Sequence, residues 1–258
     1  MADTDHRLFF ALAACAKSDA ILPTQIYFLS RERIYMNIWS TREQSLAWLG
    51  NELLQESKVV QEGFDHLGMF VELFQHIGDK EGESQVGQFC RICIVTLAKF
   101  NRLILGCYSL MLDALAQESG ALLRPLIETY ELLVYFRQDI SRINELLEDR
   151  LPSAGVIGKR ITGDYQNLRE HLNDNASHFS YKIGSVQPLF SEDAKIKLMP
   201  TPNLEVLRIN LQLLNTFQVF VLIESVNCLF AIGYDANSRA DEIEKWRDNC
   251  VKMFMLEK

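Results

Sequence analysis

The sequence predicts an all-α protein, a multi-helix bundle with long central helices. Apolar residues recur at helical spacing along most of the chain. Hydrophobic residues make up 48% of the sequence, which is enough for a sizeable core. Only 13 glycines and 6 prolines interrupt the 258 residues, too few for a turn-rich β architecture. We expect a single helical domain with N-terminal helices (1–38), core helices (40–150), a loop-rich segment that carries the site (151–200) and C-terminal helices (201–258).

The periodicity divides the chain into helical segments in a definite order. We expect helices at residues 5–18, 24–38, 42–77, 85–117, 121–138, 140–150, 163–173, 203–233 and from 238 onward. Ser40 and Glu43 have the spacing of a capping box, in which each side chain bonds the backbone N–H of the other residue, so the first core helix should start there. Gly63 and Gly68 are the points at which that helix should bend or break.

The third core helix contains a proline. Pro125 fits a helix well only near its first turn, so we expect this helix to start close to Leu123. Residues 151–164 carry three glycines and indicate a hinge or an entrance loop. Two short alternating runs further on predict one small β-hairpin near 179–198.

Local signals also place the last two helices. Thr201 is expected to be the N-cap of a long helix with Pro202 at its first position. Ser238 and Asp241 have capping-box spacing at the start of the final helix. Its apolar seam packs within the monomer or, alternatively, forms a homodimer interface. The seam consists of Ile243, Trp246, Cys250 and Phe254.

Charge and cysteine content limit the classes of function. The chain has 26 basic and 34 acidic residues, and its net charge of −8 argues against a broad nucleic-acid-coating surface but leaves room for a local basic cleft. Most of the 6 cysteines lie in apolar helical runs, which is typical of core packing in a reducing cytoplasm. Cys90 and Cys93 form a CxxC without a second such pair, so we interpret them as core residues.

Neither a membrane nor an export signal is indicated. The apolar run at 8–15 lacks the positively charged start of a signal peptide. The long apolar stretch at 209–234 contains polar residues throughout its length, which favours a core helix over a membrane span. We therefore expect a cytoplasmic protein.

A narrow polar stripe on the third core helix is the main functional signal. At about 100° per residue, Arg124, Glu128, Glu131 and Tyr135 fall on one side of a helix that is otherwise almost entirely apolar. Buried charges require partners or a water-filled cleft. We therefore expect this stripe to line a polar cleft.

The sequence segments LLRPLIETY and YQNLREHLNDNASHFS together form a longer pattern. In chain order it runs through Arg124, Glu128, Tyr165, Arg169 and His178. This order resembles uncharacterised bacterial proteins related to the HEPN-like helical superfamily, in which an LRPxxE helix precedes a tyrosine-bearing helix that ends in a histidine. The resemblance covers about residues 85 to 185.

The resemblance implies a function. Ribonucleases of this superfamily share an RxxxxH-type motif that acts on the RNA backbone without a metal ion. By this resemblance the chain binds RNA or another phosphate ligand and is a metal-independent endoribonuclease, with Arg169 and His178 as catalytic residues. Arg124, Glu128, Glu131 and Tyr165 would bind the ligand, in a cleft that needs no cofactor.

The chemistry of these residue types fits that role. A histidine titrates near neutral pH and can act as acid or base at the 2′-hydroxyl, while an arginine stabilises the charge that develops on phosphorus. His178 would be the acid or base, Arg124 or Arg169 the phosphate clamp, and Glu128 the group that orients one of them.

Two other interpretations stay open. The Arg, Glu and His side chains could instead fix helix register in a non-catalytic interaction or scaffold protein, because residues four apart on a helix form ion pairs. Glu62 with His66, and Glu72 with His76, also have metal-ligand spacing. They lie ten residues apart, about 15 Å along a helix, so we interpret them as a solvated face and expect no metal site.

Overall fold

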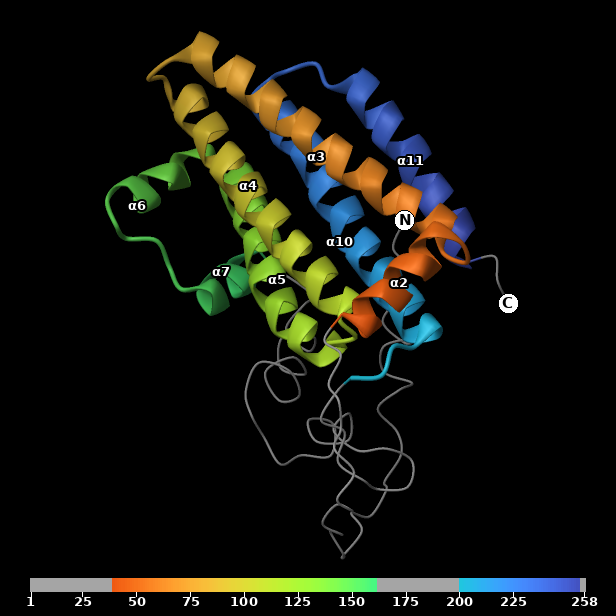
Figure 1. Cartoon of the computed structure of the whole chain (residues 1–258). Helices are drawn as coiled ribbons and strands as arrows, with labels where there is room; N and C mark the ends of the chain where they lie inside the picture. Colours follow the sequence, from red (N-terminus) through yellow and green to blue (C-terminus); the bar gives the residue numbers. More distant parts are fainter. Residues whose placement is uncertain (1–38, 162–199, 256–258) are drawn as a thin grey trace, which may run out of the picture.

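The computed structural model describes residues 39–161 and 200–255. Within these ranges the chain forms helices and no strand, which confirms the all-α prediction. The long helices lie side by side in a bundle, and α6 and α7 project to one side of it (Figure 1). The elements expected at 5–18, 24–38, 163–173 and 179–198 lie outside the described residues.

The central helix of the bundle is α10, which contacts α3, α4, α5 and α11. Its apolar residues point in nearly all directions and are buried on nearly all sides. It is also the one helix in the described ranges that is long and apolar enough to cross a membrane, but 67% of its apolar window is buried inside the protein, as in a core helix. In chain order the elements are α2 (Ser40–Gly50), α3 (Leu54–Glu81), α4 (Gln85–Leu112), α5 (Ala116–Gln138), η1 (Ile140–Arg142), α6 (Ile143–Leu147), α7 (Ala154–Arg160), α10 (Leu204–Ala231) and α11 (Asn237–Met255).

The first core segment is two helices, which corrects the prediction of one. The chain breaks at residues 51–53, between α2 and α3, whereas Gly63 and Gly68 both lie inside α3. Leu53, which lies in this break, is fully buried in the core. The expected capping box is also wrong, because Trp39 is the N-cap of α2 and its carbonyl accepts from the backbone N–H of Glu43 at 2.9 Å.

The start of α5 differs from the prediction as well. The helix begins at Ala116 and carries Pro125 in its interior. An interior proline loses one backbone hydrogen bond and costs about 3 kcal/mol. The fully buried Leu126 and Ile127 beside it offset this cost through packing. The turn before the helix lies at residues 113–115, where Ala114 has a φ of 59°.

Two further boundaries are corrected by the structure. Residues 154–160 of the expected loop form helix α7, which packs on α5. The N-cap of α10 is Asn203 instead of Thr201, and its side chain accepts from the backbone N–H of Val206 at 3.0 Å. Asparagine is at least as good an N-cap as threonine, so the cap formed two residues later.

The cysteines of the described ranges confirm the expectation of core packing. All five are buried and free. Burial raises the pKa of Cys90 to about 11 and that of Cys250 to about 12. These thiols therefore stay protonated at neutral pH and behave as small apolar groups.

Candidate functional site

The polar stripe on α5 begins with a surface ion pair. The Nε of Arg124 donates to Oε1 of Glu128 at 3.0 Å, and the two side chains are 40% and 30% exposed. A pair of this kind stabilises a helix by only about 0.3–0.5 kcal/mol. Its main effect is to orient the arginine, and the structure thus brings these two predicted site residues together.

Glu131 lies at a different depth from this pair. It has the angular position that the sequence predicts, but the residue is only 1% exposed. The helical angle gives the side of α5 on which a residue lies and not what covers that side, and α4, α7 and α10 all contact α5. Its expected role in ligand binding stays a prediction, and the 1% exposure places the side chain below the surface that Arg124 and Glu128 reach.

Tyr135 ends the stripe in a cluster of charged partners. The buried phenol donates to Oε2 of Glu145 at 2.6 Å and accepts from a terminal nitrogen of Arg160 at 2.8 Å. The guanidinium carbon of Arg142 lies 4.4 Å from the centre of the Tyr135 ring, and a nitrogen of the same group donates to the Tyr135 carbonyl at 3.0 Å. We call Tyr135, Arg142, Glu145 and Arg160 the tyrosine cluster.

The electrostatics of the tyrosine cluster keep the phenol protonated. Burial raises the pKa of Tyr135, and the hydrogen bond to Glu145 raises it further, while Arg160 opposes both effects. The cluster therefore holds a neutral hydroxyl between a carboxylate and a guanidinium. Arg160 itself remains 48% exposed and lies 3.7 Å from the other oxygen of Glu145.

The sequence did not predict the partners of Tyr135. Arg142 follows it by seven residues, which is a same-face spacing if the helix continues, and Glu145 follows Arg142 by three. That spacing was a usable signal for these two residues. Arg160 had no such signal, because its contact depends on how α7 docks on α5.

The remaining predicted residues are not placed. Tyr165, Arg169 and His178 lie outside the described ranges. Of the predicted site, the structure thus describes Arg124, Glu128 and Glu131.

The expected solvated face on α3 is packed in part. The ring of His66 meets Trp246 of α11 edge-on, with 5.4 Å between ring centroids, and its Nδ1 lies 3.9 Å from Glu242. These contacts join α3 to α11. Across residues 39–161 and 200–255, no three His, Cys, Asp or Glu side chains form a group that could hold a metal ion.

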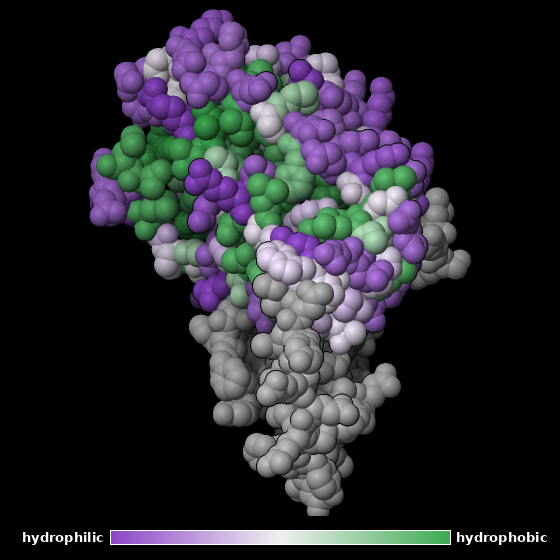
Figure 2. All heavy atoms as spheres, viewed as in Figure 1, coloured by the Kyte–Doolittle hydropathy of each residue, from purple (hydrophilic) through white to green (hydrophobic). Residues whose placement is uncertain are grey.

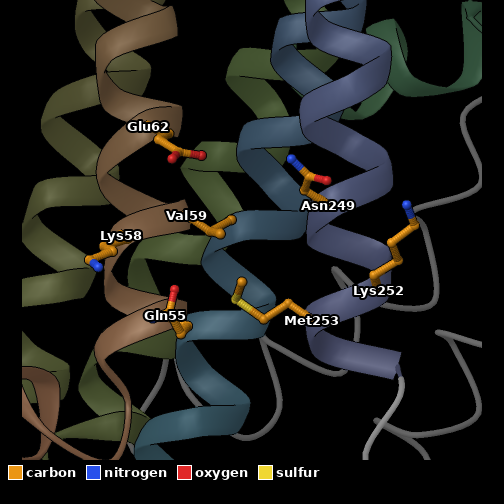
Figure 3. Close-up of a pocket in the computed structure, with 7 residues that line it drawn as sticks. All are labelled: Gln55, Lys58, Val59, Glu62, Asn249, Lys252 and Met253. Carbon is orange, nitrogen blue, oxygen red and sulfur yellow. The ribbon is translucent and has the colours of Figure 1, made fainter.

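A groove of about 430 Å³ lies between α3 and α11, away from the stripe on α5. Glu62 and Asn249 extend toward each other across it, and the ammonium groups of Lys58 and Lys252 point away from it (Figure 3). Because neither lysine faces the interior, the groove lacks the converging cations of an anion site.

No family model, curated protein or solved structure matches the chain. The HEPN-like resemblance therefore stays a prediction from the motif residues.

Proposed function

We propose that this protein binds RNA, or another ligand that carries several phosphate groups, along α5. The observation that supports the proposal is the arrangement of two half-exposed arginines. Glu128 orients Arg124, and the Tyr135 hydroxyl together with Glu145 orients Arg160. A guanidinium held in a fixed direction binds phosphate oxygens well, because its planar donors match their geometry.

The separation of the two arginines favours a ligand with more than one phosphate. Arg124 and Tyr135 are eleven residues apart in one helix, a rise of about 16 Å, and at 3.6 residues per turn they lie on nearly the same side. Arg160 is bonded to Tyr135, so it marks the far end of this distance. A ligand with several phosphates in a row, such as a strand of RNA, can contact both guanidiniums along this distance.

Cleavage of the bound RNA is the second part of the proposal and rests on the sequence alone. His178 would move the proton at the 2′-hydroxyl, and Arg169 would stabilise the charge on the phosphate. Neither step requires a metal ion.

Binding is tested with a fluorescently labelled single-stranded RNA of mixed sequence, titrated at several salt concentrations. For a single strand, the slope of log affinity against log salt is about −0.7 per phosphate contact, so each lost contact reduces the magnitude of the slope by about 0.7. We expect Arg124→Gln and Arg160→Gln each to weaken binding and to make this slope less steep. Arg247→Gln on α11, where the arginine pairs with Glu244 and Asp248, is the matched control and should change neither. Unchanged affinity and slope in both α5-side variants would refute the binding proposal.

Cleavage is tested with the same RNA in the presence of EDTA. Wild type should shorten the RNA, and His178→Ala should bind it equally well without cutting it. Circular dichroism of the variant checks that the fold is retained. If wild type binds the RNA but does not cleave it, the binding proposal holds and the nuclease proposal is refuted.

A scaffold function is the second candidate, and the Arg124–Glu128 pair favours it. A spacing of four with partial exposure is an ordinary helix-stabilising arrangement. Under this alternative, wild type does not bind RNA at all, and Arg124→Gln changes only the stability, by less than about 0.5 kcal/mol.

A further inference from the structure

Helix α4 has a charge pattern unlike that of the whole chain. The protein has a net charge of −8, yet the 28 residues of α4 contain Arg91, Lys99 and Arg102 and no aspartate or glutamate. All three basic residues are exposed. Arg91 pairs with Glu83 at 3.1 Å, whereas Lys99 and Arg102 form no ion pair with any described residue. The outer side of α4 is therefore a positive strip on a negative protein.

Large apolar side chains lie within the same strip. Val95 is 69% exposed and Leu105 is 48% exposed. With 3.6 residues per turn, positions 91, 95, 98, 99, 102 and 105 fall within about 120° of the helix circumference. We call this the α4 face; it consists of Arg91, Val95, Ala98, Lys99, Arg102 and Leu105.

Helix α6 extends the apolar surface beside the α4 face. It contacts α4, and its Leu146 and Leu147 are 39% and 59% exposed. Figure 2 shows hydrophobic residues gathered over α4 and α6 on the side turned to the viewer, with hydrophilic residues between them. Apolar side chains that remain exposed together in this way mark interaction sites.

The spacing on the α4 face fits a helix as the occupant. Arg91, Val95, Ala98, Arg102 and Leu105 follow one another at intervals of four, three, four and three residues. This alternation is the seam spacing of helices that pack nearly parallel or antiparallel. Ala98 at the middle of the seam lets a partner backbone come close. The cations within the seam (Arg91 and Arg102) and beside it (Lys99) select acidic residues on that partner.

The same features disfavour other occupants. A two-fold dimer through this face would set its cations against their own copies, because both subunits would use the same patch. Single-stranded nucleic acid binds to aromatic side chains on which bases stack, and the six residues of the α4 face include no aromatic ring.

We propose that the α4 face binds an acidic amphipathic helix of a partner protein. Leucine or isoleucine side chains of that helix would contact Val95 and Leu105, and its carboxylates would pair with Lys99 and Arg102. This surface is distinct from the arginines beside α5, so the proposal does not depend on RNA binding.

A displayed peptide library tests the proposal against the purified full chain. The peptides are helix-forming, with Leu, Ile or Val at the seam positions and equal chances of Glu, Lys or Gln at the flanking positions. We expect wild type to enrich peptides with Glu at the flanks. Lys99→Glu combined with Arg102→Glu should invert the preference to Lys, because these two side chains would contact the flanking charges of the peptide directly. Val95→Asp should lower the affinity of a selected acidic peptide by about tenfold or more.

The controls separate the α4 face from a general charge effect. Lys58→Glu combined with Lys80→Glu makes the same charge change on exposed positions of α3, and it should keep the preference for Glu. No enrichment by wild type, or equal enrichment by the Lys99→Glu/Arg102→Glu variant, would overturn the proposal. Vesicles with anionic lipid, a single-stranded RNA and self-association of the chain are measured in parallel. Binding to any of them that Val95→Asp abolishes, without enrichment of acidic peptides, would assign the face to that occupant instead.

Discussion

Gln218 of α10 packs its side-chain amide directly against the backbone of α3 at Gly63. A Cβ atom on Gly63 would lie 2.5 Å from Oε1 of Gln218. The amide cannot easily move away, because it is fully buried and its Nε2 donates to the Val60 carbonyl at 3.1 Å. Helices α3 and α10 thus meet at a position where only glycine fits.

Gly63→Ala should therefore destabilise the protein. Alanine gains up to about 1 kcal/mol in helix propensity over glycine, but the added methyl displaces a bonded amide inside a packed core, which costs about 1–3 kcal/mol. We expect a net loss of about 1–2 kcal/mol in the free energy of unfolding, measured by urea denaturation.

Gly68 provides the matched control in the same helix. A Cβ on Gly68 would meet no atom within 4 Å, so only the propensity effect remains. We expect Gly68→Ala to stabilise the protein by about 0.5–1 kcal/mol. Stabilisation by both substitutions would contradict the close packing at Gly63.

The two glycines also show what the sequence could predict of the fold. Periodicity was sufficient for the helical class and for most of the long helices, since each buried side has to repeat at 3.6 residues. It gave the wrong break in the first core segment. A glycine inside a helix costs only about 1 kcal/mol, which is too little to end a helix that is packed on both sides of the glycine. At Gly63 the close packing of Gln218, which is distant in sequence, even requires a glycine.

Pro125 was misinterpreted for the same physical reason. Local rules place a proline at the first turn of a helix, and the hydrogen bond lost in the interior is a cost that only tertiary packing can offset. The packing partners of α5 are α4, α7 and α10, and their positions are not encoded near the proline.

The tyrosine cluster makes a testable contribution to stability. In Tyr135→Phe the hydroxyl that lies between Glu145 and Arg160 is removed, and the rest of the buried ring is kept. We expect a loss of about 1–2 kcal/mol in the free energy of unfolding, because two charge-assisted hydrogen bonds are lost. We also expect faster amide exchange across α7, since Arg160 connects this helix to α5.

An exposed tyrosine controls for the general effect of losing a hydroxyl. Tyr234 is 38% exposed, and Tyr234→Phe should change neither stability nor exchange in α7. If Tyr135→Phe leaves the exchange of residues 154–160 as it is in wild type, the 3.7 Å contact between Arg160 and Glu145 is sufficient to hold α7.

The candidate site was predictable only where its residues are close in sequence. The pairing of Arg124 with Glu128 follows from their spacing of four in a helix. The burial of Glu131 and the hydrogen bond from Arg160 to Tyr135 depend on which helices pack against α5. A single sequence contains no local signal for such contacts.

Glu224 of α10 is a buried carboxylate with a partner on α5. The residue is 3% exposed, and its carboxylate accepts from Nε of Arg137 and, at 3.3 Å, from Asn227. Burial raises the pKa of Glu224, and the bonds from Arg137 and Asn227 oppose this effect without cancelling it. A carboxyl whose pKa is higher in the folded state binds its proton more tightly there, so its burial costs more stability as pH rises.

Arg137→Ala should expose that cost. At pH 7 the variant leaves a buried carboxylate without its cation, and we expect a loss of about 3 kcal/mol in the free energy of unfolding. The loss should shrink as pH falls toward the ordinary pKa of a glutamate, because the carboxyl then takes up a proton and no charge remains buried.

Adding Glu224→Gln to Arg137→Ala should recover part of the loss at pH 7 and remove its pH dependence. The exposed Glu205 of the same helix gives the control, since Glu205→Gln in the Arg137→Ala background should recover nothing. Urea denaturation between pH 4 and pH 7 measures all four proteins, and a deficit of Arg137→Ala that grows as pH falls would show that Glu224 is not the group responsible.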